Sequence, residues 1–205
     1  MNVLRIVVLA SGNGTNLQAL IDAEKAGRLG PGHIVGVISD QRDAHALKRA
    51  ASAGIPVVIE EVDAGLPVDT QLRELSDRLL RDLRDMNAEL IILAGFLVVL
   101  EGEIVDAYAG RIINLHPSLL PKYGGAGMYG ETVHLSVLAA GETESGCTVH
   151  IVDAGTDTGP ILLQRKVPVL RSDTAETLAE RIHGEEHIAI VEAAALMAEK
   201  LSVLH

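Results

Sequence analysis

The stretch that decides the fold is Ile6-Val7-Val8-Leu9-Ala10-Ser11-Gly12-Asn13-Gly14-Thr15-Asn16, near the start of the chain. Its first five residues are apolar and mostly β-branched, which is typical of a strand buried on both faces. A helical pattern follows from Leu17 to about Ala26. A buried strand, a glycine-rich turn and a helix together predict the first βα unit of a parallel sheet.

The same plan repeats as far as about residue 115. Further strands are predicted at His33–Ser39, Pro56–Ile59, Leu90–Ala94 and Arg111–Leu115, and helices at Asp43–Ala53, Val68–Met86 and Glu103–Tyr108. The longest of these helices shows one apolar stripe at steps of three and four residues. This alternation predicts right-handed βαβ units around a parallel sheet.

The pattern changes after Pro117, where a Pro/Gly-rich loop runs to Met128. A helix is predicted at Glu131–Ala140, and an antiparallel hairpin at Cys147–Val152 and Ile161–Pro168. Asp173, with Glu176 three residues later, predicts the N-cap of a final helix towards Leu204, broken near Gly184. We therefore predict an α/β fold with a Rossmann-like, mostly parallel central sheet, a C-terminal antiparallel hairpin and helices on both faces. No linker-like composition separates the halves, which predicts a single domain over residues 1–205.

The composition narrows the classes of partner. The 205 residues include 17 Lys and Arg against 28 Asp and Glu, a formal net charge of −11, so a nucleic acid is an unfavourable partner. One Phe, three Tyr and no Trp provide few faces for stacking bases. The opening apolar run is too short for a membrane span or a signal peptide, and the single Cys147 agrees with a reducing compartment. We expect a cytoplasmic protein that binds small molecules, and neither nucleic acid nor membrane.

The glycine-rich segment between the first strand and helix is a candidate anion site. Its glycines allow close approach of the backbone, and the free N–H groups of a helix start attract negative charge. Leu17 stands where the dinucleotide fingerprint requires Gly or Ala. A phosphate or phosphomonoester is therefore the better ligand class, with an ordinary tight turn as the alternative.

A second candidate lies at the end of the fifth predicted strand. Asn114 and His116 are two residues apart, so their side chains share a face at the sheet edge where ligands bind. An amide donor and an imidazole suit a reaction that forms an oxyanion and protonates a leaving group. Asp157, in the hairpin loop, would raise the pKa of His116 if the loop reaches it. The alternative is that all three are ordinary hydrogen-bonding residues of a strand end and a turn.

The segment His183–His187 reads H-x-x-E-H, a zinc metalloprotease pattern in which two histidines one turn apart share a metal. Gly184 weakens that helix and the chain is short for such a peptidase, so we favour a non-metal interpretation. His150, with Asp153 and Asp157 nearby, is likewise interpreted as part of a hydrogen-bonding set. The remaining histidines are interpreted as structural or solvent-exposed: His33, His45, His134 and His205.

Together these segments resemble the folate-dependent formyltransferase family, and within it the phosphoribosylglycinamide formyltransferases. The matching stretches are VVLASGNGTNLQAL at 7–20, ILAGF at 92–96, YAGRIINLHPSLLPKY at 108–123, GCTVHIVDAGTDTGPILLQ at 146–164 and EEH at 185–187. NLHPSLLP with a later D-x-G-P-I is typical of the wider family, and SGNGTN of the members acting on glycinamide ribonucleotide.

The resemblance implies an enzyme that transfers a formyl group from 10-formyltetrahydrofolate to the amine of phosphoribosylglycinamide, in purine biosynthesis. It implies no metal, leaves monomer or homodimer open, and assigns phosphate binding to about 1–115 and folate binding and catalysis to about 116–205. The implied catalytic residues are Asn114, His116 and Asp157. The implied ribonucleotide contacts are Gly14, Thr15, Asn16, His183, Gly184, Glu185 and Glu186. The implied folate contacts are Leu97, Val98, Val99, Leu100, Asn114, Asp153, Ala154, Gly155, Thr156 and Asp157.

Some residues depart from the family pattern. An arginine expected before the third helix is absent, because that stretch reads Gly65-Leu66-Pro67-Val68. The loop after Pro121 is longer than the commonest pattern, so Lys122, Tyr123 and Met128 receive no catalytic role. The alternatives are a formyltransferase or deformylase of the same fold with another acceptor, and a non-catalytic phosphate- or nucleotide-binding module.

Overall fold

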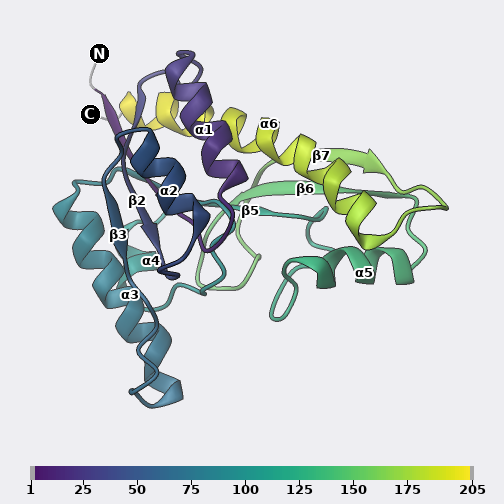
Figure 1. Cartoon of the computed structure of the whole chain (residues 1–205), viewed down its shortest axis with the longest axis horizontal. Helices are drawn as coiled ribbons and strands as arrows, with labels where there is room; N and C mark the ends of the chain where they lie inside the picture. The colour runs from purple at the N-terminus through teal and green to yellow at the C-terminus, as the bar shows by residue number, and fades with distance from the viewer. Residues whose placement is uncertain (1–2, 204–205) are drawn as a thin grey trace.

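The structure is a computed structural model that describes residues 3–203. Its seven strands form one sheet in the order β3-β2-β1-β4-β5-β6-β7 (Figure 1). The strands are β1 (Leu4–Leu9), β2 (Gly32–Ser39), β3 (Val57–Ile59), β4 (Leu90–Leu93), β5 (Ile112–His116), β6 (Glu144–Ile151) and β7 (Ile161–Pro168). The helices are α1 (Thr15–Lys25), α2 (His45–Ser52), α3 (Val68–Asp85), α4 (Glu103–Ala107), α5 (Glu131–Ala139) and α6 (Ala175–Ser202).

The sheet is parallel from β3 to β5 and antiparallel where β6 and β7 follow. This arrangement confirms the predicted fold class, including the C-terminal hairpin. The chain first builds outward from β1 to β3 and then returns to place β4 on the other side of β1. Open α/β sheets bind ligands in the crevice at such a reversal of strand order.

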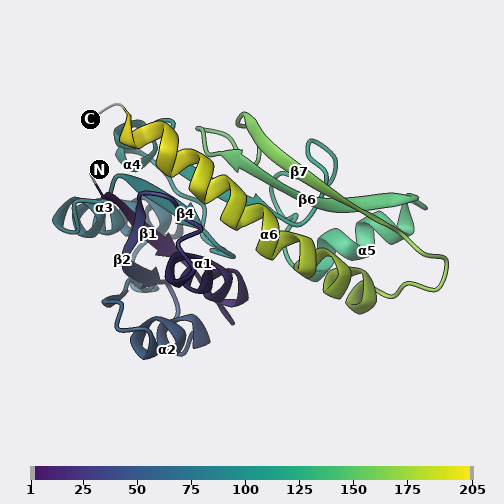
Figure 2. The ribbon, with the colours of Figure 1, turned by 90° about the horizontal axis from the view of Figure 1, so that it is seen from above.

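Helices cover both faces of the sheet, as the continuous apolar strands predict. One core lies between the sheet and α1, α2 and α6, and a second lies beneath α3 and α4 (Figure 2). Both cores are built almost entirely from Leu, Ile, Val and Ala, with Phe96 and Tyr108 as the aromatic members of the second. Burial on both sides explains why β1 and β4 carry apolar residues without alternation.

The final helix corrects two predictions. Its N-cap is Thr174, whose hydroxyl and that of Thr177 form a capping box, rather than the expected Asp173 with Glu176. Asp173 instead accepts hydrogen bonds from Arg181. The helix also continues through Gly184, because buried side chains on both sides of it pack on the sheet and outweigh the low helix propensity of one glycine. The predicted end at Leu204 lies outside the described residues.

The other predicted elements are present, with ends that differ from the prediction by at most three residues. Between residues 3 and 203, no helix is both long enough and apolar enough to cross a membrane.

Candidate active site

A cavity of about 620 Å³ lies at the carboxyl ends of β1, β4 and β5. Its walls come from the glycine-rich loop, the segment after β4, the end of β5, the loops at 125–130 and 152–157, and two side chains of α6. A larger groove of about 860 Å³ lies between α1 and α6, but none of Asn114, His116 and Asp157 lines it. The smaller cavity is therefore the site in which the candidate chemical groups converge.

The glycine-rich loop enters α1 without a capping side chain. Gly14, the N-cap residue, has φ +71°, a conformation that favours glycine, and Thr15 is the first helical residue. The first N–H groups of α1 therefore point, uncapped, into the side of the cavity that Gly14, Thr15 and Asn16 line. Arg49 of α2 holds the loop from behind, since its Nε donates to the Asn13 carbonyl at 2.8 Å. Such a loop can bind an anion.

Gly14→Ala is expected to destabilise the protein. A Cβ at this position would lie 2.7 Å from Cα of Ala46, in addition to the positive φ. We expect the free energy of unfolding to fall by about 1–3 kcal/mol, measured by urea denaturation. Gly12→Ala is the matched control, because a Cβ there meets nothing within 4 Å. Equal stability of the two variants would contradict the close packing of the loop on α2.

Ser11 ties the glycine-rich loop to the segment after β4. Its N–H donates to the Gly95 carbonyl at 3.0 Å, and its hydroxyl accepts a hydrogen bond from the Leu97 amide at 2.8 Å. This segment supplies an apolar wall that includes two large solvent-exposed residues, Leu97 (61% exposed) and Val99 (46% exposed). The full set of wall residues from the segment is Leu97, Val98, Val99 and Leu100. Exposed apolar side chains in a concave site suit a flat organic ligand.

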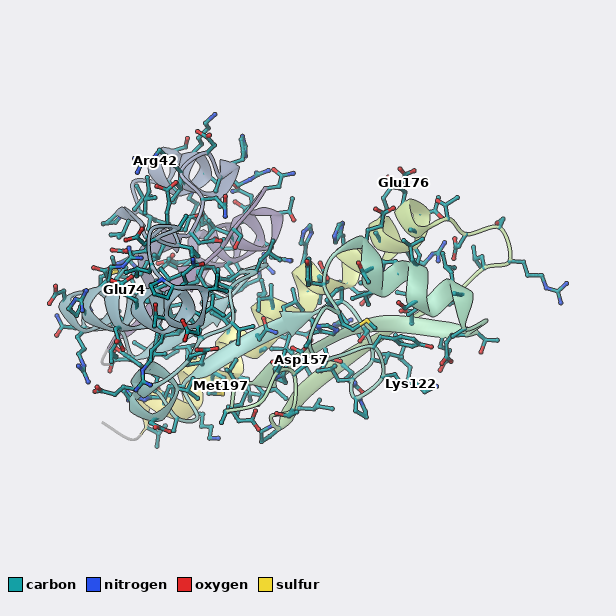
Figure 3. The ribbon with its side chains drawn as sticks, turned by 90° about the horizontal axis from the view of Figure 1, so that it is seen from below. Arg42, Glu74, Lys122, Asp157, Glu176 and Met197 are labelled. Carbon is teal, nitrogen blue, oxygen red and sulfur yellow. The ribbon has the colours of Figure 1, made fainter. Side chains whose placement is uncertain are left out.

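Asn114, His116 and Asp157 meet at the centre of the cavity. Asn114 and His116 project from the same face of β5, as their spacing predicts, and Asp157 reaches them from the loop between β6 and β7. Nδ1 of His116 lies 3.4 Å from Oδ2 of Asp157, and Nδ2 of Asn114 lies 3.4 Å from Oδ1. Figure 3 shows Asp157 near the middle of the long axis of the molecule.

His116 is buried, and its two ring nitrogens face different acceptors. Nε2 donates to the Tyr123 carbonyl at 2.7 Å, which leaves Nδ1 as the nitrogen available to a ligand. Burial lowers the pKa of His116, and the Asp157 carboxylate and the Tyr123 carbonyl act in the opposite direction. The carboxylate therefore has the predicted effect, but burial outweighs it and the pKa lies below 6.5. The backbone of Tyr123, which received no role from the sequence, holds the ring in place.

Asp157 is held by several groups at once. Its backbone has φ +58°, and its side chain accepts a hydrogen bond from the Gly125 amide at 3.0 Å. Nε2 of His150 on β6 lies 3.4 Å from Oδ1 of Asp157 and 3.2 Å from Nδ2 of Asn114. Burial acts to raise the pKa of Asp157, but the contacts from His150, Gly125 and His116 outweigh it, so the pKa is lowered. The carboxylate is therefore ionised at neutral pH, and His150 belongs to the hydrogen-bonding set that the sequence indicated.

The opposite end of the cavity joins α1 to α6. Nδ2 of Asn16 donates to Oε2 of the buried Glu186 at 3.3 Å, and His183 lies 3.8 Å from the same oxygen. Burial raises the pKa of Glu186, while His183 and Asn16 act to lower it. Gly184 and Glu185 are not among the lining residues, because they point to other faces of α6, and Glu185 pairs with Arg165 at 2.9 Å.

The sequence also assigned residues of the hairpin loop to the cavity, and they line it in the structure. They are Asp153, Ala154, Gly155, Thr156 and Asp157. His134, which was interpreted as structural or exposed, is buried on α5 and also lines the cavity. No local motif marks His134, because the long loop before α5 brings it there. Among the described residues, no three His, Cys, Asp or Glu side chains are grouped to hold a metal ion.

Comparison of the sequence with known proteins identifies the family to which the chain belongs. The model of the formyl transferase family matches residues 4–194. The chain belongs to the formyl transferase family. The family match spans the whole sheet, so it includes both the glycine-rich loop and the catalytic candidates of β5 and the hairpin loop.

Individual members of the family are similar over most of the chain. Phosphoribosylglycinamide formyltransferase of Escherichia coli is 41% identical over 188 residues, covering 90% of this chain and 82% of the relative. The trifunctional purine biosynthetic protein adenosine-3 of Drosophila pseudoobscura pseudoobscura is 47% identical over 196 residues, but the chain spans only 14% of its length. The crystal structure of glycinamide ribonucleotide transformylase 1 from Symbiobacterium toebii has a TM-score of 0.87 and 42% identity, covering 97% of this chain and 89% of that one.

Proposed function

We propose that this protein transfers the formyl group of 10-formyltetrahydrofolate to the amine of phosphoribosylglycinamide, as a step of purine biosynthesis. The observation that carries the proposal is the meeting of Asn114, His116 and Asp157 in a cavity that also contains an uncapped helix N-terminus. The names of the similar family members support this choice of donor and acceptor.

The two ends of the cavity suit the two substrates. The uncapped start of α1 would bind the phosphate of the ribonucleotide, through Gly14, Thr15 and Asn16. His183 and Glu186 of α6, which line the cavity, would contact the rest of the ribonucleotide. The apolar wall at 97–100 and the loop at 153–157 would hold the pterin of the folate. Asn114 then lies where the two substrates meet.

The proposed roles of Asn114, His116 and Asp157 in formyl transfer follow from their charges and hydrogen bonds. Attack of the amine on the formyl carbon forms a new C–N bond and a tetrahedral intermediate with a negative oxygen. Asn114 can donate to that oxygen when its 3.4 Å hydrogen bond to Asp157 gives way. The ionised Asp157 keeps a negative charge beside His116, which stabilises the imidazolium form that the burial of the ring opposes.

His116 would complete the transfer as an acid. Its Nε2 is held by the Tyr123 carbonyl, so Nδ1 takes the proton that the attacking amine loses and passes it to the departing folate nitrogen. The bond between that nitrogen and the formyl carbon then breaks, giving tetrahydrofolate and the formylated ribonucleotide. Since proton transfer needs no metal in this scheme, we propose that the protein works without one.

The proposal is tested by mixing the purified protein with 10-formyltetrahydrofolate and phosphoribosylglycinamide and following the absorbance of the donor. Donor loss that requires both substrates, with formation of the formylated ribonucleotide, is the expected result. Donor loss without the ribonucleotide would indicate a deformylase. Binding of the ribonucleotide without any turnover would indicate a non-catalytic binding module, and both results would contradict the proposal.

The proposed function also includes an expected domain organisation, oligomeric state, partner class and cellular compartment. We propose that residues 1–205 act as one formyltransferase unit, as a monomer or homodimer, on small molecules and without nucleic acid or membrane partners. The free, buried Cys147 and the formal charge of −11 fit a cytoplasmic enzyme of this kind.

A further inference from the structure

His134 is a buried polar residue to which the mechanism above gives no role. It lies on α5 with 4% of its surface exposed, and it lines the active-site cavity. Neither of its ring nitrogens has a hydrogen-bond partner among residues 3–203, and Nδ1 lies wholly inside the protein. Nε2 is the ring nitrogen that is not fully enclosed, so it is the unpartnered nitrogen that a ligand in the cavity can complete.

The environment of the ring selects its tautomer. A proton on Nδ1 would be a buried donor with no acceptor, so the neutral form with the proton on Nε2 is favoured. Burial lowers the pKa of His134, and the neighbouring His183 and His116 lower it further, so a second proton is also disfavoured. The imidazole therefore presents an uncharged N–H donor to the cavity through its Nε2 edge.

The position of His134 indicates which part of a ligand it meets. It lines the cavity together with His116 of β5 and with His183 of α6, the helix on which α5 packs, so it shares a wall with the groups at both ends of the cavity. The phosphate would lie elsewhere, at the start of α1. An uncharged N–H donor in this wall suits an uncharged oxygen, and in phosphoribosylglycinamide the amide carbonyl carbon is two bonds from the nitrogen of the reacting amine.

We propose that His134 is a specificity residue that donates a hydrogen bond from Nε2 to the amide carbonyl of the acceptor substrate. This inference rests on the proposed function and extends it. The hydrogen bond would distinguish a glycinamide ribonucleotide from a ribose phosphate that lacks the amide, and it would orient the amine towards the formyl carbon.

The test compares two ligands in calorimetric titrations: phosphoribosylglycinamide and ribose 5-phosphate. His134→Phe keeps a planar ring but loses the donor, and we expect it to weaken binding of the ribonucleotide about 3- to 10-fold while binding of ribose 5-phosphate is unchanged. His134→Gln places an N–H near the position of Nε2 and should restore most of the affinity. His45→Gln, at an exposed position of α2, is the control.

Each outcome has a defined meaning. Equal weakening of both ligands by His134→Phe would show a structural role and overturn the inference, as would unchanged binding of the ribonucleotide. A ¹⁵N NMR spectrum of the free protein with the His134 proton on Nδ1 would also overturn it. If the wild-type protein binds ribose 5-phosphate but has neither affinity nor turnover with the ribonucleotide, the proposed function itself fails.

Discussion

His116→Ala is expected to lower kcat by about 10²–10³ while the protein remains folded. The substitution removes the imidazole of β5 whose Nδ1 lies 3.4 Å from Oδ2 of Asp157, and with it the proposed proton donor for the departing nitrogen. It also removes the shorter of the two hydrogen bonds to the Tyr123 carbonyl, 2.7 Å from Nε2, and leaves the 3.4 Å bond from the Ser118 hydroxyl. Steady-state assays with both substrates at saturation would measure the effect on kcat.

The control for this variant is His45→Ala, which removes an exposed imidazole of α2. Circular dichroism and the melting temperature of both variants separate a catalytic defect from unfolding. Turnover of His116→Ala close to that of the wild-type protein would remove the proposed acid from the mechanism. Unchanged KM values for both substrates with reduced kcat would be the clearest support, because they indicate an interaction made in the transition state.

Asp157→Asn is expected to lower kcat by at least about 10², although the new side chain has nearly the same shape. Its carboxylate is the shared partner of Asn114, His116 and His150, so its loss removes the negative charge that these three groups share. Because this charge acts to raise the pKa of His116, that pKa should fall further below 6.5 in the variant. An NMR titration of the His116 ring measures this shift independently of turnover.

The matched control is Asp77→Asn, an exposed position on α3. It makes the same chemical change away from the cavity and should leave kcat unaltered. A His116 pKa that stays constant in Asp157→Asn would mean that the 3.4 Å contact carries little electrostatic energy. A reduced kcat with an unshifted pKa would then assign Asp157 to the positioning of Asn114 alone.

The fold could be predicted from the sequence because the patterns that identify its strands and helices lie within short segments of the chain. Runs such as Ile6–Ala10 and Leu90–Ala94 have no alternation, and only burial on both faces explains them. The final helix was harder to predict, since the sequence shows Gly184 but not the core contacts that keep the helix continuous. The choice between Asp173 and Thr174 as the cap depends on backbone geometry, which spacing does not encode.

The site was predictable only where its residues belong to motifs. Asn114 and His116 share a strand, so their common face follows from the sequence. The approach of Asp157 depends on the length and path of the hairpin loop, and was expected from resemblance alone. His134 and the Tyr123 carbonyl escaped prediction, because one is brought to the cavity by a long loop and the other acts through its backbone.

The single helix α6 has a consequence for how the molecule loses its structure. Over its 28 residues, about 42 Å, it packs against β1, β2 and β4 of the parallel part and against β6 and β7 of the hairpin. Its side chains also contact α1 and α5. Neither half can open without exposing part of the apolar face of the same helix. We expect the two ends of the sheet to be thermodynamically linked, so that a ligand bound beside Glu186 slows amide hydrogen exchange along α6 as far as its other end.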